Sequence, residues 1–184
     1  MKITIFGLEG TGKSSSAKLL ADHLGYEYKS SGAMMREMAN SEGITLEEFN
    51  TNRLNKVKEE GDDSADREID EYIRKYGEVN DNFVFESRLA WSLIPDSFRV
   101  KLVCSDEVRA RRVAVRDGIS EGEAIENNIR RQKENKEVFE TIYNIKNYPP
   151  EDEEFDLVVD TGENSLEEVV GLVVGEINII HKEK

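Results

Sequence analysis

The octapeptide GLEGTGKS, Gly7 to Ser14, constrains the fold of this chain more than any other stretch. It fits the pattern G-x-x-x-x-G-K-[ST] and stands between an apolar, β-branched run, Lys2–Phe6, and a segment with helical spacing, Lys13–Leu24. In that context glycines let backbone N–H groups converge on phosphate oxygens, and the helix directs its positive end at them. Lys13 can reach the β and γ phosphates, and the Ser14 hydroxyl can ligate Mg²⁺. The alternative is an ordinary glycine-rich turn, which the complete pattern disfavours.

The motif therefore predicts a site for a nucleoside triphosphate. Its members are Gly7, Leu8, Glu9, Gly10, Thr11, Gly12, Lys13, Ser14 and Ser15.

Short apolar strands alternate with helices along the rest of the chain. After the first strand, further strands are predicted at Tyr26–Lys29, Phe83–Phe85, Val100–Val103 and Leu157–Val159. Helices are predicted at Lys13–Leu24, Met34–Asn40, Leu46–Glu60, Ser64–Tyr76, Val108–Arg116, Glu121–Thr141 and about 165–180. This order predicts an α/β fold with a central parallel sheet flanked by helices. The polar stretches at about 31–76 and 117–150 are expected to be two insertions in a single domain, 1–184.

Composition narrows the class of protein. The 184 residues are 38% hydrophobic and include 39 acidic against 25 basic residues, a formal net charge of -14. A field of that sign disfavours nucleic acids and anionic membranes as partners. Cys104 is the only cysteine, so no internal disulfide forms. No signal peptide or membrane-spanning run is visible, and we expect a cytoplasmic monomer.

The phosphate motif alone does not choose an activity, because GTPases, small-molecule kinases and motor ATPases all use it. A GTPase would carry N-K-x-D, and the nearest sequence here is Asn144-Ile145-Lys146-Asn147. The chain is too short for a motor with a second domain. Its size and two insertions favour a kinase for small metabolites.

Beyond this motif the chain resembles cytidylate kinases, within the wider nucleoside monophosphate kinase family. The segment S-G-A-M-x-R is similar to the bacterial enzymes, whereas GITLEEFN, DREID and ESRLAW look more like the short archaeal type. The resemblance rests on the order and spacing of GLEGTGKSSSAKLLADHLG, SSGAMMREMA, DREID, FVFESRLAW, VRARRVAVRDGIS and DLVVDTG.

The resemblance implies an acceptor-nucleotide site formed by Ser31, Gly32, Arg36 and Arg88. The chemistry agrees, because arginine forks grip phosphate oxygens bidentately and stay charged at physiological pH. Arg36 is expected near the start of a helix with a capping serine. Arg88 follows an apolar strand, at the carboxyl edge where such sheets bind ligands.

Several readings stay open around this site. Glu37 stands beside Arg36, and Glu86 stands close to Arg88. A surface ion pair with this glutamate is the alternative to phosphate binding for each arginine. Glu86 either positions hydrated magnesium or orients the arginine. Asp66 and Arg67 either line the acceptor pocket or belong to a solvated helix face.

The resemblance also implies a lid. Arg112 and Arg116 lie four apart, hence on one helix face, and similar arginines contact the triphosphate and stack on adenine. Arg130 and Arg131 resemble lid arginines that close on the transferring group, and Thr161 lies in a segment similar to one that cups the donor adenine. The alternative for the lid pair is an exposed helix held by ion pairs with Glu126 and Glu134. The implied catalytic residues are Lys13, Arg116, Arg130 and Arg131.

Two positions depart from the pattern. Where cytidylate kinases carry an acidic residue and then an arginine, this chain has Asn135 and Val138. Either Lys133 or Lys136 compensates, or the acceptor differs from CMP, or the enzyme is weak. We expect an ATP- and Mg²⁺-dependent kinase for CMP or dCMP. The alternatives are another nucleotide or small-metabolite acceptor, or a non-catalytic nucleotide-binding regulator.

Overall fold

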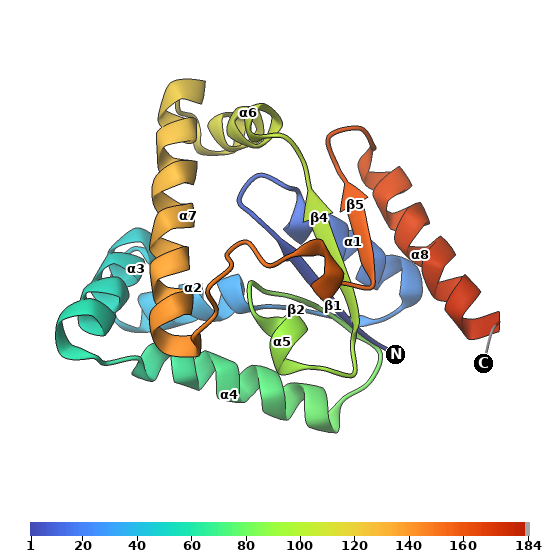
Figure 1. Cartoon of the computed structure of the whole chain (residues 1–184), viewed down its shortest axis with the longest axis horizontal. Coiled ribbons are helices and arrows are strands. Elements are labelled where there is room, and N and C mark those ends of the chain that lie inside the picture. Colours follow the sequence, from blue (N-terminus) through green and yellow to red (C-terminus); the bar gives the residue numbers. More distant parts are fainter. Residues whose placement is uncertain (183–184) are drawn as a thin grey trace.

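The computed structural model describes residues 1–182, and these form a five-stranded parallel sheet with helices on both faces (Figure 1). The strands run in the order β2-β3-β1-β4-β5, so β1 is central. Their bounds are Lys2–Gly7 (β1), Glu27–Ser30 (β2), Phe83–Glu86 (β3), Phe98–Val103 (β4) and Leu157–Asp160 (β5). The helices are Lys13–Leu24 (α1), Ser31–Ser41 (α2), Leu46–Asn55 (α3), Ser64–Val79 (α4), Ala90–Leu93 (α5), Asp106–Asp117 (α6), Glu121–Tyr143 (α7) and Leu166–Lys182 (α8).

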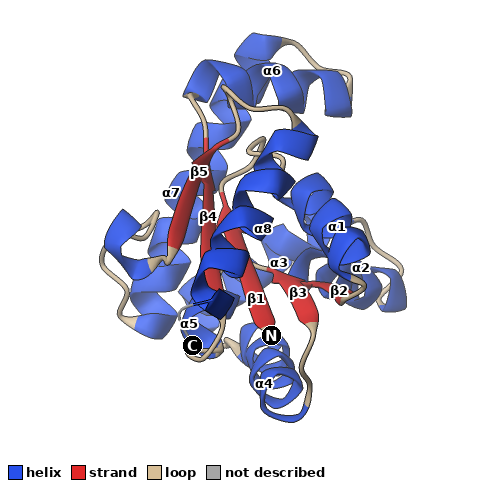
Figure 2. Cartoon of the chain, turned by 90° about the vertical axis from the view of Figure 1, so that its right-hand side faces the viewer, coloured by secondary structure: helices blue, strands red, loops and turns tan. Residues whose placement is uncertain are grey.

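One face of the sheet is covered by α1 and α8, which lie side by side in Figures 1 and 2. Strand residues two apart point to the same face, so Ile3 and Ile5 of β1 join the apolar sides of both helices. From α8 these include Val169 and Val173. This cluster is the larger part of the core and anchors the helix that follows the phosphate motif.

The opposite face is covered by α4, α5 and the end of α7. Ile69 and Ile73 of α4 pack against Phe83 and Phe85 of β3, although the sequence of α4 is mostly polar. Phe6 of β1 points to this face as well and packs with aromatic residues from the later part of the chain. The segment between β2 and β3 is therefore partly built into the core.

The carboxyl ends of the three middle strands meet at one edge. Ile5 of β1 lies beside Glu86 of β3, and Gly7 lies beside Leu102 of β4. The segments that follow these strands are the phosphate motif, the Ser87-Arg88 pair and the loop into α6. The sheet thus brings together three segments that are distant in sequence.

The predicted strands and helices are confirmed, although several of their ends differ by one to three residues. The helix at Met34–Asn40 begins earlier, at Ser31, and the single helix expected at Leu46–Glu60 ends at Asn55 and continues as a π-helical turn, Lys56–Glu60. The short helix α5 was not predicted, because four residues give no periodic signal. Within residues 1–182, no helix combines the length and apolar character needed to cross a membrane.

Two glycine substitutions are predicted to have opposite effects on stability. A Cβ on Gly77 in α4 would lie 2.9 Å from Cγ1 of the buried Ile94, so Gly77→Ala should overpack the core and lower the free energy of unfolding by about 1–2 kcal/mol. A Cβ on Gly171 in α8 meets nothing within 4 Å. Gly171→Ala should therefore gain helix propensity and stabilise by about 0.5–1 kcal/mol. Urea unfolding of both variants measures the difference, and equal shifts would contradict the packing argument.

Candidate active site

The phosphate motif forms a loop at the carboxyl end of β1. Gly10 and Gly12 have φ values of +83° and +77°, a region that favours glycine. A Cβ on Gly10 would lie 2.5 Å from the carbonyl oxygen of Arg109, so only glycine permits this approach to α6. The buried Arg109 donates from Nε to the carbonyl of Glu9 at 2.8 Å. Arg109 lies on α6 and holds the loop through this hydrogen bond. The sequence analysis did not predict this role.

Beside this loop lies a cleft of about 470 Å³, a size typical of small-molecule sites. It brings together much of the predicted donor site. The lining residues are Gly10, Thr11, Gly12, Lys13, Ser14, Ser15, Ser16, Arg112, Val113, Arg116, Thr161, Asn164, Leu166 and Val169. The residues that sequence reasoning missed come from α1, α6, α8 and the β5–α8 loop, and no local pattern distinguishes them from packing residues.

Arg112 joins three of the segments around this cleft. Its Nη1 donates to the Thr161 hydroxyl at 2.9 Å, and its Nη2 donates to the Thr161 carbonyl at 2.6 Å. The Thr161 hydroxyl in turn donates to the carbonyl of Thr11 at 3.0 Å. Three segments, the phosphate loop, α6 and the end of β5, are therefore connected by direct hydrogen bonds.

Gly7, Leu8 and Glu9 do not line the cleft. Gly7 ends β1, and the Leu8 carbonyl accepts from the Thr11 hydroxyl at 2.8 Å. Glu9 points instead towards two cations. Its Oε2 lies 4.0 Å from Nζ of Lys13, and its Oε1 lies 3.5 Å from Nη1 of Arg131 on α7.

The Glu9 carboxylate carries a charge that several cations stabilise. Burial alone would raise its pKa, but the positive charges of Lys13, Arg88, Arg131 and Arg116 outweigh that effect and lower it. These cations come from four separate parts of the chain. Their charges therefore act together on one carboxylate.

The ion pairs of Arg116 and Arg130 are with other carboxylates. Arg116 forms a two-pronged ion pair with Asp117, with contacts of 2.7 and 2.8 Å. Arg130 lies 3.7 Å from Glu134 and 3.9 Å from Glu47 of α3. Arg130 thus adopts the helix-surface alternative, whereas its neighbour Arg131 reaches the phosphate loop.

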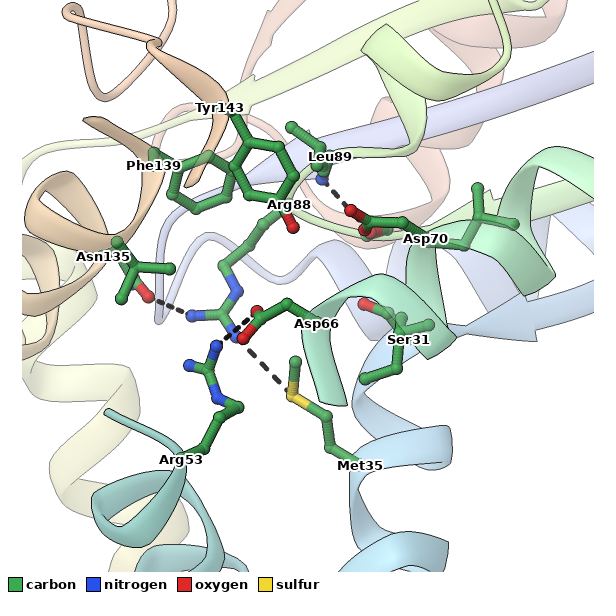
Figure 3. Close-up of a pocket in the computed structure, with 14 residues that line it drawn as sticks. Ser31, Met35, Arg53, Asp66, Asp70, Arg88, Leu89, Asn135, Phe139 and Tyr143 are labelled. Atoms are coloured by element: carbon green, nitrogen blue, oxygen red, sulfur yellow. Dashed lines mark hydrogen bonds and ion pairs between the residues drawn. The ribbon is translucent and has the colours of Figure 1, made fainter. Parts of the chain in front are cut away.

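A second cavity lies between α2, α4, α7 and the end of β3 (Figure 3). It contains Ser31 and Arg88 of the predicted acceptor site but not Gly32 or Arg36. Its volume is only about 30 Å³, so its walls must separate before a nucleoside can enter. The lining residues are Ser31, Met35, Arg53, Asp66, Ile69, Asp70, Ile73, Ser87, Arg88, Leu89, Asn135, Val138, Phe139 and Tyr143.

The expectation of a serine-capped helix start beside Arg36 is wrong. Ser30 occupies the N-cap position of α2, but its side chain makes no capping hydrogen bond. Arg36 lies in the second turn, exposed, where the helix dipole acts weakly. Its Nη1 lies 3.7 Å from the position that a Cβ on Gly32 would take, so it points back towards the start of the helix.

Arg88 enters the second cavity from the end of β3. It donates from Nη1 to Oδ1 of Asn135, and its Nη2 lies 3.7 Å from the sulfur of Met35 (Figure 3). Asn135 and Val138, the two departures from the family pattern, both line this cavity. Their side chains therefore border the predicted acceptor site rather than the helix surface.

Glu86 makes no ion pair with Arg88. It is buried and accepts a hydrogen bond from the Tyr28 hydroxyl at 2.8 Å. Burial and the Glu86 charge raise the pKa of Tyr28 to about 12. These contacts do not fit the hypothesis that Glu86 orients Arg88. They also do not fit the alternative, a surface ion pair between the two residues.

Asp66 and Arg67 separate into different roles. Asp66 is buried in the second cavity and pairs with Arg53 of α3, with 2.5 Å between Oδ1 and Nη1. Arg67 is exposed and pairs with Asp63 at 2.6 Å. Sequence reasoning missed Arg53, because an arginine in a polar helix resembles a solvated residue until the tertiary fold encloses it.

Solved structures of other proteins share this architecture. The chain is similar to a protein from Eubacterium ventriosum described as uncharacterized, with a TM-score of 0.70, 18% identity and coverage of 97% and 98% of the two chains. It is also similar to a shikimate kinase from Bacteroides thetaiotaomicron, with a TM-score of 0.64, 15% identity and the same coverage. The fold is that of the P-loop kinases.

Sequence comparison narrows this to a family. The model of the cytidylate kinase-like family matches residues 2–163. A cytidylate kinase of Sulfolobus acidocaldarius is 35% identical over 180 residues, 97% of this chain and 94% of that protein. One of Methanocaldococcus jannaschii is 34% identical over 187 residues, 99% and 100% of the two chains. The chain belongs to the cytidylate kinase-like family.

Replacing the Glu9 carboxylate should strengthen phosphate binding. Glu9→Gln removes the negative charge that competes with a ligand phosphate for Lys13 and Arg131, so the KM for ATP should fall several-fold, in line with about 1 kcal/mol for a partly exposed ion pair. The melting temperature of the ligand-free protein should fall slightly, because clustered cations lose their counter-charge. Steady-state kinetics and thermal melts measure both effects.

Glu126→Gln, on the exposed side of α7, is the matched control and should change neither quantity. A higher KM for ATP in Glu9→Gln would contradict the competition and indicate that the carboxylate assists nucleotide binding.

Proposed function

We propose that this protein transfers the γ-phosphoryl group of ATP to CMP or dCMP, with Mg²⁺. The observation that carries the proposal is the position of Glu9 among cations of the two predicted sites. Nζ of Lys13 and Nη1 of Arg131 lie 4.0 and 3.5 Å from its carboxylate oxygens, and the charge of Arg88 also lowers the pKa of Glu9. Two phosphate groups held by these residues would meet there, as phosphoryl transfer requires.

The donor side would use the loop amides and Lys13 to hold the triphosphate. Ser14 is exposed and lines the cleft, so its hydroxyl is available to a ligand. It fits a Mg²⁺ ion, which takes one or two protein oxygens together with phosphates and water. The metal, when bound, neutralises phosphate charge.

The acceptor side would use Arg88 and Arg36 to hold the monophosphate, with Ser31 and Gly32 beside them. Arg131 and Arg116 would neutralise charge that develops during transfer, with Arg130 joining them on closure. No general base is needed, because positioning and charge neutralisation supply most of the catalysis. The names of the archaeal relatives support a cytidine nucleotide as acceptor.

We also propose that residues of about 31–76 form the acceptor-binding insertion and about 117–150 the lid. Two contacts join these segments, Lys58–Glu137 at 2.5 Å and Arg130–Glu47 at 3.9 Å. ATP and nucleoside monophosphates are dissolved in the cytoplasm, where we expect the enzyme to act.

A coupled assay of ADP formation with CMP, dCMP, UMP, AMP, GMP and shikimate tests the activity. We expect the largest kcat/KM with CMP or dCMP. A larger value with another acceptor would redirect the assignment. No ADP with any acceptor would contradict an enzymatic role and favour a nucleotide-binding regulator.

Removing the acceptor arginines should separate the two substrates. Arg88→Ala should lower kcat/KM for the acceptor about 100-fold or more, because a bidentate phosphate contact is lost, while the KM for ATP changes less than threefold. Arg36→Ala should likewise raise the KM for the acceptor, with little change in the KM for ATP. Arg111→Ala, exposed on α6, is the control and should behave as wild type. Equal loss of affinity for both nucleotides would contradict these roles.

A further inference from the structure

We propose that Arg53 and Asp66 recognise the acceptor base and select a 4-amino pyrimidine over a 4-oxo pyrimidine. The inference rests on the proposed function, since it assigns the substrate specificity of the same acceptor cavity. It adds two residues that the phosphate-binding arginines leave unexplained.

The contact between Arg53 and Asp66 leaves one buried donor and one buried acceptor without a hydrogen bond. Arginine and carboxylate commonly meet through two parallel hydrogen bonds. Here a single contact, from Nη1 of Arg53 to Oδ1 of Asp66, joins them. Within residues 1–182, Nε of Arg53 and Oδ2 of Asp66 are buried without a hydrogen-bond partner. Buried polar atoms are normally paired, so these two indicate a missing partner.

Both residues that carry the unpaired atoms line the acceptor cavity (Figure 3). The Arg53 side chain is 6% exposed and that of Asp66 is 8% exposed. Water in bulk therefore cannot satisfy them. A ligand that enters this cavity is the available partner.

A second carboxylate, that of Asp70, also lines the cavity. Burial raises the pKa of Asp70, and the nearby Tyr143 hydroxyl partly opposes that rise. Burial and the Asp70 carboxylate raise the pKa of Tyr143. Of the two carboxylates, only Asp66 has a buried oxygen without a hydrogen-bond partner within residues 1–182.

The free atoms complement the edge of a cytosine ring. Cytosine presents an amino donor at N4 beside an acceptor at N3, so Asp66 Oδ2 can accept from N4 while Arg53 Nε donates to N3. Uracil presents an acceptor at O4 and a donor at N3, the opposite order, and would face oxygen with oxygen. Apolar side chains complete the walls and limit the size of the ring. They are Ile69, Ile73, Leu89, Val138 and Phe139.

Asp66→Asn tests this assignment, because the amide can present a donor where the carboxylate presented an acceptor. The ratio of kcat/KM for CMP to that for UMP should fall at least tenfold, while the KM for ATP stays within threefold of wild type. Arg67→Gln breaks an exposed ion pair on the same helix and is the matched control, with no change in the ratio. A purely structural role of Asp66 would reduce the use of both acceptors equally, and that result would overturn the proposal.

The wild-type protein provides a second test that needs no folded variant. The 5′-monophosphate of pyrimidin-2-one riboside lacks the 4-amino group without added bulk, and we expect its kcat/KM to be at least tenfold below that of CMP. Equal use of the two would overturn the proposal even if Asp66→Asn fails to fold. An absence of ADP with every acceptor would instead refute the proposed function.

Discussion

Several cationic side chains lie close to the phosphate loop in the ligand-free protein, and much of the structure serves to hold them there. Lys13, Arg88, Arg116 and Arg131 all act on the same small region. Without substrate they repel one another, and the chain supplies internal anions that offset the repulsion. Glu9 and Asp117 lie among them. The large acidic excess of the sequence is therefore compatible with a strongly cationic site.

The parallel sheet makes this gathering possible. All five strands end at one edge, so a loop after β1, an arginine after β3 and a helix after β4 become neighbours despite long separations in sequence. The burial of α1 and α8 against one face fixes the loop, and α4 against the other face fixes Asp66. Core packing on each side thus determines where each substrate would bind.

The sequence was sufficient to predict the sheet, most helices and the donor loop, because these depend on local periodicity and on a contiguous motif. It also placed Arg88 correctly at the carboxyl edge of the sheet, because Arg88 closely follows a strand. It was insufficient for Arg53 and Arg109, whose roles arise only when distant helices enclose them. Glu9 was predicted only as a member of the motif, and its contact with Arg131 depends on a helix more than 100 residues away.

The long helix α7 contacts both the phosphate loop and the second cavity. Arg131 in its middle reaches the phosphate loop, and Asn135, Val138 and Phe139, one to two turns later, form a wall of the second cavity. A continuous helix moves as a rod, so its two functions share one degree of freedom. A movement of this helix that opened the wall of the second cavity would also shift Arg131 relative to the phosphate loop.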